Sequence, residues 1–484
     1  MRLNHEKTPV ITAIKEYQKL DVIPFDVPGH KRGRGIPELV EFFGEGILDI
    51  DYNSMKCLDN IGNPNGVIKE AHELMADLYG ADHAFFLTNG TTSGVQAMIM
   101  SACDCGEELI LPRNVHKSVI NGLIIAGVRP VYIQPEVNYD LGITIGVTPE
   151  RVEEAILQNP KAKAVFIINP TYYGVVSDLK KIIEICKKYD KAVLVDEAHG
   201  AHLAFHEELP ESAMSLGADM AAVSLHKTGG SLTQSSVLLL KDGKIPKGRV
   251  TSILNMTQTT SASYLLMASL DGARKILATR GKDIFTKALQ ISRYAREEIN
   301  KIPYLYAFGK ELIDGKGVFN YDETKLSINT SQLGITGLEV YDILRNEYMI
   351  QMELADVHNV MAIISLGDDM KNVEVLIAAL KGISKKYKKD KVIKNTVVLE
   401  NPEVVLPPRE AFYKERRSIP IEESEGYISG EFFMVYPPGI PILTPGERIT
   451  KEILKYIRIL KDEKAVFTDN YDPEIKNIMI IDLK

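Results

Sequence analysis

The sequence predicts an α/β protein with one large, mainly parallel sheet of seven strands and a smaller α+β part after it. Between residues 83 and 241, short apolar runs alternate with helical patterns, as in repeated strand–helix units. The runs are almost continuously apolar, which is typical of strands covered on both faces. A long helical pattern at Ser263–Lys301 then leads out of this region.

Seven strands are predicted from β-branched, aromatic and other apolar runs. They are His83–Leu87, Glu108–Leu111, Val131–Ile133, Ala164–Ile168, Ala192–Val195, Met220–Val223 and Val237–Leu240. The helices expected between them are Gly94–Ala102, Val115–Ala126, Pro149–Gln158 and Asp178–Tyr189. A further helix is expected to begin near Asn63, because Pro64 is tolerated in a first turn, and to end at Gly80.

A chain of 484 residues is too long for a single core, and we expect four parts. Residues 1–60 form an N-terminal arm with one early helix, and residues 61–300 form the large domain. Residues 301–395 form a small α+β domain, and residues 396–484 form a C-terminal segment. Glu400–Pro420 is expected to be a linker, and Tyr436–Pro441 a rigid turn.

Composition narrows the class of protein. A content of 45% hydrophobic and 25% charged residues is typical of soluble globular proteins, and the net charge of −8 argues against nucleic-acid binding. No apolar run is long enough to span a membrane, and the N-terminus lacks the apolar core of a signal peptide. The four cysteines form no C-x-x-C pair. We therefore expect a cytoplasmic enzyme without membrane or nucleic-acid partners.

Two polar residues at the ends of apolar runs point to a cofactor. Lys227 follows Ala218–Val223, and a desolvated lysine is a natural Schiff-base former. Asp196 ends the strand that begins at Ala192. Pyridoxal phosphate requires a lysine for its aldehyde and a carboxylate for its pyridinium nitrogen, so this pair predicts that cofactor.

The loop Thr88–Gly94 follows one strand and opens a helix. Its hydroxyls and the free N–H groups of a helix N-terminus could hold a phosphate. An ordinary capped turn is the alternative, since Thr and Ser are common caps. The loop lacks the P-loop pattern, so a mononucleotide site of that type is not indicated.

Other segments at strand ends allow two interpretations each. His116 could stack on an aromatic cofactor or be a surface residue at a helix start, and Asn169–Gly174 could line a ligand crevice or form a simple turn. The histidines at 199, 202 and 206 have helical spacing, but no carboxylate-bearing zinc motif accompanies them. We therefore expect no metal, and expect His199 to line the cofactor pocket.

Taken together and in order, these segments resemble the bacterial ornithine/lysine/arginine decarboxylases of the aspartate-aminotransferase fold. The motifs are Asn-Gly-Thr-Thr-Ser-Gly at 89–94, Pro-Arg-Asn-Val-His-Lys-Ser at 112–118, Asn-Pro-Thr-Tyr-Tyr-Gly at 169–174, Asp-Glu-Ala-His-Gly at 196–200, Ser-Leu-His-Lys-Thr-Gly-Gly-Ser-Leu-Thr-Gln-Ser-Ser at 224–236 and Tyr-Pro-Pro-Gly-Ile-Pro at 436–441. The chain is most similar to the short, biosynthetic arginine decarboxylases, and we expect it to lack the N-terminal regulatory domain of the larger members.

The resemblance implies fold type I of the pyridoxal-phosphate enzymes and a role for each matching residue. Lys227 carries the cofactor as a Schiff base, Asp196 pairs with the ring nitrogen and His116 stacks on the ring. Lys227 or His226 is the acid that reprotonates Cα. The residues implied to surround the cofactor phosphate are Thr91, Thr92, Ser93, Ser224 and His226.

Two further residues extend the implied site beyond one cofactor pocket. Thr259 is implied to reach the phosphate of a neighbouring subunit, which requires at least a homodimer with shared active sites. Glu353 is implied to meet the distal cation of the substrate. His199 departs from the pattern, because some large lysine enzymes carry Trp there, and this leaves the substrate open.

The reaction implied is decarboxylation of L-arginine to agmatine and CO2 for polyamine and spermidine biosynthesis. Lysine or ornithine stays open as the substrate. Another pyridoxal-phosphate reaction, by an aminotransferase or a lyase, is the more distant alternative. A transcription regulator of the same fold would need an N-terminal DNA-binding domain, and residues 1–60 show no such pattern.

Overall fold

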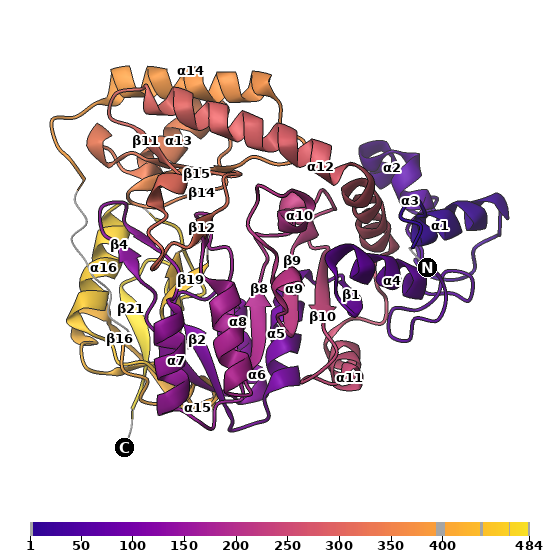
Figure 1. The fold of residues 1–484 in the computed structure, drawn as a ribbon, viewed down its shortest axis with the longest axis horizontal. Coiled ribbons are helices and arrows are strands. Elements are labelled where there is room, and N and C mark those ends of the chain that lie inside the picture. Colours follow the sequence, from indigo (N-terminus) through magenta and orange to yellow (C-terminus); the bar gives the residue numbers. More distant parts are fainter. Residues whose placement is uncertain (1–2, 394–401, 436–438, 464, 483–484) are drawn as a thin grey trace. The chain divides into compact units, whose positions relative to one another are not determined.

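The computed structural model describes residues 3–393, 402–435, 439–463 and 465–482 (Figure 1). Within it the chain divides into two compact units. The first comprises Met1–Ser101 and Leu194–Phe285, and the second comprises Ala102–Val193 and Thr286–Lys484. Each unit is therefore assembled from two stretches that are distant in the sequence.

Seven strands form the main sheet in the order β1-β10-β9-β8-β6-β2-β3. They are β1 (His83–Leu87), β2 (Glu108–Pro112), β3 (Arg129–Ile133), β6 (Ala164–Ile168), β8 (Ala192–Asp196), β9 (Met220–Val223) and β10 (Ser236–Leu240). In the first unit β10 is antiparallel to β1 and β9, and β9 is parallel to β8. In the second unit β2 is parallel to both β3 and β6. The predicted seven-stranded, mainly parallel sheet is confirmed.

The first unit adds helices before and between its strands. They are α1 (Pro9–Lys19), α2 (Pro37–Phe43), α3 (Glu45–Asp49), α4 (Val67–Tyr79), α5 (Gly90–Ala102), α9 (Ala213–Leu216), α10 (Leu225–Thr228), α11 (Lys247–Thr257) and the first part of α12 (Tyr264–Asn300). The arm thus holds α1, α2 and α3 rather than the single helix expected, and α1 packs on α4. Within the described part of the chain, no helix combines the length and apolar character needed to cross a membrane.

Two helices begin later than the sequence pattern suggested, and in both cases a capping side chain explains the shift. The helix expected from Asn63 begins at Val67, because Asp59 accepts hydrogen bonds from the backbone at its start. The helix expected from Val115 begins at Lys117, since His116 is extended and its ring caps the first turn through Ser118 N.

The second unit carries most of the remaining elements. Its helices are α6 (Lys117–Ala126), α7 (Pro149–Gln158), α8 (Leu179–Lys188), α13 (Gly337–Glu347), α14 (Met370–Tyr387), α15 (Pro408–Tyr413) and α16 (Lys451–Asp462). Helices α7 and α8 lie side by side (Figure 1). A four-stranded antiparallel sheet has the order β11 (Tyr306–Phe308), β13 (Lys325–Asn329), β15 (Asn359–Ile363) and β14 (Leu354–Ala355). Helix α13 packs on β15 and α14.

The C-terminal residues form two small sheets around their own apolar core. One has the order β16 (Arg416–Pro420), β21 (Asn477–Ile481) and β17 (Ile428–Ser429), and the other β19 (Ile440–Leu443), β18 (Phe433–Val435) and β20 (Phe467–Thr468). The predicted linker was wrong in its described part, because α15 and β16 lie within it. Of the predicted rigid turn, Tyr436, Pro437 and Pro438 lie outside the described residues.

Short elements complete each unit, with η1 in the first and the others in the second. The paired strands are β4 (Val137–Asn138) with β5 (Ile143–Thr144), and β7 (Val175–Val176) with β12 (Asn320–Tyr321). The 3-10 turns are η1 (Leu203–Phe205), η2 (Lys310–Leu312), η3 (Ser331–Leu333) and η4 (Ile421–Glu423).

Candidate active site

A cluster of hydroxyl groups lies where β1 gives way to α5 in the first unit. Thr91 Oγ1 donates to Ser236 Oγ over 2.9 Å and is also hydrogen-bonded to Ser224 Oγ. The first N–H groups of a helix have no partner within it, so this end of α5 attracts an anion. Thr92 and Ser93 lie in the same first turn, and Thr92 is exposed. The predicted phosphate-binding residues Thr91 and Ser224 are therefore in contact.

Gly94 allows α5 to begin directly against the sheet. A Cβ at this position would lie 2.7 Å from Leu87 Cδ1 and 3.4 Å from Ala222 Cβ. A larger residue at this position would require the Leu87 side chain to move. Gly94 thus allows close packing of α5 against Leu87 of β1.

The C-terminal end of β8 delivers two buried carboxyl groups. Asp196 is 7% exposed, and its Oδ1 accepts a hydrogen bond from Ala198 N over 3.1 Å. Burial raises the pKa of Asp196, while the Ala198 N–H and the charge of Lys227 act in the opposite direction. Glu197 is fully buried, and burial raises its pKa to about 8.

Lys227 lies in the one-turn helix α10, which follows β9. Its Nζ is 2.8 Å from Nε2 of His199, a residue that follows β8. The structure therefore brings together the predicted cofactor lysine, a predicted pocket histidine and, through the electrostatic effect on its pKa, Asp196. The parallel strands β8 and β9 explain this meeting, because their C-terminal ends lie at one edge of the sheet.

His226 is held beside Lys227 in a defined orientation. Its Nδ1 donates to the Ser235 carbonyl over 3.0 Å. A carbonyl can only accept, so the proton is on Nδ1 when the ring is neutral. Nε2 is then the nitrogen that can accept a proton.

The structure places two other predicted site residues in the second unit. His116 caps α6, where its Nδ1 accepts from Ser118 N over 3.2 Å. Glu353 is exposed just before β14, and its backbone N–H donates to the Met361 carbonyl. The roles implied for His116 and Glu353 remain predictions.

The three histidines with helical spacing have separate structural tasks. His199 contacts Lys227, His202 Nδ1 lies 3.1 Å from Thr228 Oγ1, and His206 Nδ1 accepts from Glu208 N. Across the described residues, no group of three potential ligands is placed to hold a metal ion.

Comparison with known proteins identifies the family. The model of the Orn/Lys/Arg decarboxylase major domain matches residues 8–372, and that of the C-terminal domain matches residues 391–476. The chain belongs to the Orn/Lys/Arg decarboxylase family. This membership confirms the predicted family and the predicted class of enzyme.

Relatives within the family are similar over nearly the whole chain. A protein of Bacillus anthracis named arginine decarboxylase is 47% identical over 461 residues, which cover 94% of each chain. One of the same name from Bacillus subtilis is 44% identical over 459 residues and likewise covers 94% of both. The solved lysine decarboxylase of Francisella novicida has a TM-score of 0.84 at 22% identity, and the match covers 98% of this chain and 81% of that one. The structural likeness confirms the predicted fold type.

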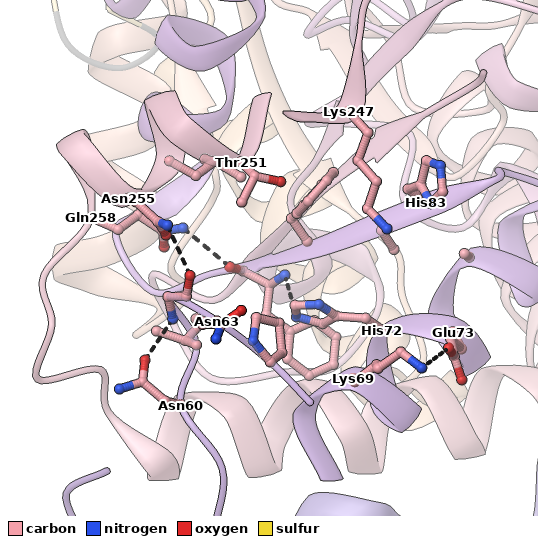
Figure 2. A pocket seen from close by; sticks show the side chains of 18 of the residues that line it. Asn60, Asn63, Lys69, His72, Glu73, His83, Lys247, Thr251, Asn255 and Gln258 are labelled. Atoms are coloured by element: carbon pink, nitrogen blue, oxygen red, sulfur yellow. Dashed lines mark hydrogen bonds and ion pairs between the residues drawn. The ribbon is translucent and has the colours of Figure 1, made fainter. Parts of the chain in front are cut away.

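A cavity of about 650 Å³ in the first unit lies apart from Lys227, which does not line it. Figure 2 shows Lys69, His72 and Glu73 of α4 facing residues of α11 across it. Burial lowers the pKa of His72 to about 4, so this ring is neutral, and its Nε2 accepts from Phe86 N. The exposed Thr259, predicted to serve a neighbouring subunit, lies on the wall of this cavity.

Sequence reasoning missed two side chains that support the hydroxyl cluster. Ser236 contacts Thr91 from the start of β10, and Gln258 Oε1 accepts from Thr88 N over 3.3 Å. A serine at the start of an apolar strand was the available signal for Ser236. Gln258 lies 170 residues from Thr88, and no local pattern marks it.

Proposed function

We propose that this chain catalyses pyridoxal-phosphate-dependent decarboxylation of L-arginine to agmatine and CO2, in the cytoplasm and for polyamine biosynthesis. The observation that carries the substrate is the 44–47% identity to proteins named arginine decarboxylase. The structural neighbour named lysine decarboxylase is only 22% identical. Lysine and ornithine are the alternatives, and a different pyridoxal-phosphate reaction is a more distant one.

The residues of the first unit fit this cofactor. Asp196 is a buried carboxylate for which, among the described residues, one backbone donor is found. Burial raises its pKa more than this donor and the charge of Lys227 lower it, and a pyridinium N–H would supply a further donor. The hydroxyls of Thr91 and Ser224, at the N-terminus of α5, suit the phosphate. Lys227 Nζ would hold the aldehyde carbon covalently.

When bound, the cofactor supplies a ring that accepts the electrons left on Cα as CO2 departs. Asp196 would keep a proton on the ring nitrogen. The positive charge of that protonated nitrogen would make the ring a stronger acceptor of electrons. His116 would stack against the ring face. These residues perform no bond making of their own, and their contribution is electrostatic and positional.

Returning a proton to Cα requires an acid near the reacting atoms. Lys227 is our first candidate, because its Nζ lies 2.8 Å from His199 Nε2. A lysine and a histidine at this distance can share one proton, so His199 can take a proton from Nζ or resupply it. His226 is the alternative donor through Nε2, since its Nδ1 is occupied by Ser235.

Glu353 is proposed to recognise the distal cation of the substrate. In the single chain it is exposed, and an exposed carboxylate discriminates poorly between charged and neutral partners. The proposal therefore requires a partner subunit that covers Glu353. A guanidinium could then form a two-pronged hydrogen bond that an ammonium cannot.

The assembly we propose is at least a homodimer with shared active sites. Three large apolar side chains of the arm are exposed, Ile23 at 74%, Phe25 at 94% and Phe42 at 79%. Contact with a partner subunit would remove such side chains from water. Mixing inactive Lys227→Ala and Thr259→Ala chains, under conditions where subunits exchange, should restore part of the activity. Failure of such rescue would count against a shared site.

The substrate is tested by giving purified protein arginine, lysine and ornithine separately. We expect CO2 and agmatine from arginine at the highest kcat/KM, and borohydride should fix the cofactor on Lys227. In Glu353→Gln, loss of one charge-assisted hydrogen bond should cost about 1.5–3 kcal/mol in kcat/KM for arginine. A preference for lysine or ornithine would overturn the substrate, and an unchanged variant would overturn the role of Glu353.

A further inference from the structure

We propose that Glu447, in the C-terminal part of the chain, positions His116 through an ion pair with Arg113. Arg113 and His116 both lie in the loop that connects β2 to α6. The inference rests on the proposed function, in which His116 stacks on the cofactor ring. It assigns the C-terminal part a task in the active site, namely to fix the loop between β2 and α6. All the residues involved lie in the second unit.

Arg113 and Glu447 form a bidentate ion pair that has little access to water. Arg113 Nε donates to Glu447 Oε1 over 2.9 Å, and Nη2 donates to Oε2 over 2.8 Å. Arg113 is 8% exposed and Glu447 is 1% exposed. Glu447 is itself held, since Thr444 N donates to its Oε2 over 2.7 Å. The planar guanidinium can therefore take only one orientation.

Residues at and just before β19 hold the loop at further points. Arg113 Nη1 donates to the Pro441 carbonyl over 2.9 Å, and Lys117 N donates to the Gly439 carbonyl over 3.1 Å. Lys117 Nζ also pairs with Asp469 at 2.8 Å. Arg113 and Lys117 flank Asn114–His116, so both ends of the loop are attached to the C-terminal part.

Between Arg113 and Lys117, further hydrogen bonds restrict the conformation of the loop. Asn114 Nδ2 donates to Thr144 Oγ1, and His116 Nδ1 is used by Ser118. With Nδ1 held by Ser118, the orientation of the His116 ring and of its Nε2 depends on the backbone of this loop. A shift of Arg113 would move that backbone and would therefore change the orientation of the ring.

A buried ion pair is a costly way to fasten two parts of a protein together. Apolar side chains of the same volume often stabilise a fold equally well or better. A bidentate guanidinium–carboxylate pair additionally fixes the relative orientation of its two side chains. Burial lowers the pKa of Arg113, but the charge of Glu447, the neighbouring Tyr132 and the hydrogen bond to Glu447 together outweigh this and keep the guanidinium ionised. The pair is thus suited to positioning more than to adhesion.

The test combines Glu447→Gln with His116→Ala in a double-mutant cycle on the holoenzyme. The readouts are the dissociation constant of pyridoxal phosphate and the visible circular dichroism of the bound cofactor. In wild-type background, Glu447→Gln should weaken cofactor binding about 10-fold and change the dichroism band. In the His116→Ala background the same substitution should change the affinity less than about 2-fold.

Glu431→Gln is the matched control. Glu431 is also a buried glutamate of the C-terminal part, and it accepts hydrogen bonds from Met479 N and Tyr471 N instead of gripping the loop. It should lower the melting temperature and leave the dichroism band unchanged. If Glu447→Gln behaves like this control, or weakens the cofactor equally in both backgrounds, the positioning role is refuted.

Arg113→Lys covers the case in which Glu447→Gln does not fold. Lysine keeps the positive charge but cannot form the bidentate pair. The cofactor dissociation constant and the dichroism band again test the positioning role. If His116→Ala alone leaves the cofactor unchanged, the inference fails while the decarboxylase function stands. Failure of the proposed function is seen separately, as wild-type protein that neither binds the cofactor nor releases CO2 from arginine.

Discussion

Two regions of the first unit contain carboxyl groups that have similar solvent exposure and very different numbers of hydrogen-bond donors. Asp59, at the start of α4, is 8% exposed and accepts from five backbone N–H groups, those of Asn60, Asn65, Gly66, Ile68 and Lys69. Asp196, at the end of β8, is 7% exposed and accepts from Ala198 N. Their solvent exposure is thus similar, but Asp196 lies deeper in the protein, so the two carboxyl groups differ both in depth and in the number of donors.

The pKa values respond in opposite directions. Burial pushes the pKa of Asp59 up, but its backbone donors outweigh this and the net shift is downward. Burial also pushes the pKa of Asp196 up, and there its single donor and Lys227 do not compensate. Where a carboxylate serves the fold, the chain supplies all its donors. For Asp196, at the end of β8, we infer that the cofactor supplies a further donor.

The largest effect that would test this contrast is on catalysis by Asp196→Asn. The amide cannot hold a proton on the ring nitrogen, so turnover should fall at least about 100-fold, or about 3 kcal/mol. The cofactor should still bind, because Lys227 and the hydroxyl cluster are intact. Near-wild-type turnover in a cofactor-loaded variant would remove the functional half of the comparison.

Asp59→Ala should instead reduce stability. Removing the acceptor leaves several N–H groups at the start of α4 without a partner, at a cost of about 3 kcal/mol. Because the folded pKa of Asp59 is depressed, its contribution is present above the unfolded pKa and is lost as pH falls. Urea unfolding at pH 7 and pH 3 should therefore show a smaller difference between variant and wild type at pH 3. A constant difference would contradict an ionised cap.

Most of the sheet was predictable because its strands are marked locally. β6, β8 and β10 are buried at every position and, apart from Asp196 and Ser236 at their ends, appear in the sequence as apolar runs. That Lys227 lies close enough to affect the pKa of Asp196 was predictable for a related reason, since the ends of β8 and β9 meet at one edge.

What could not be predicted depends on partners distant in sequence. The start of α4 was misplaced because its cap, Asp59, precedes the helix by several residues. The ion pair between Arg113 and Glu447 joins residues 334 positions apart. Neither residue carries a local pattern that distinguishes it from an exposed charge.

The substitution Glu197→Gln tests the comparison through the pH dependence of the free energy of unfolding. The fully buried Glu197 accepts from Ala213 N over 2.7 Å, and among the described residues nothing reaches its Oε2. Its folded pKa of about 8 lies above its unfolded value, so stability is present at low pH and is lost as pH rises towards 8. Glutamine has no such dependence.

With both proteins cofactor-free, the stability of the variant relative to wild type should therefore increase by about 3 kcal/mol between pH 5 and pH 7.5, since one pKa unit corresponds to about 1.4 kcal/mol. Urea unfolding at the two pH values measures this. A difference that does not grow with pH would mean that Glu197 is not held neutral.

The smallest expected effect separates the number of donors from charge itself. Glu70 lies in the first turn of α4, the helix that Asp59 caps, and its carboxylate is partly exposed and pairs with Lys7 at 2.7 Å. Exposed ion pairs contribute little, and a negative charge at a helix N-terminus adds a few tenths of a kcal/mol. Glu70→Gln should thus reduce the free energy of unfolding by about 0.5 kcal/mol or less at low salt, and by less still in 1 M NaCl. If it cost as much as Asp59→Ala, helix electrostatics would explain the role of Asp59, and the count of backbone donors would not.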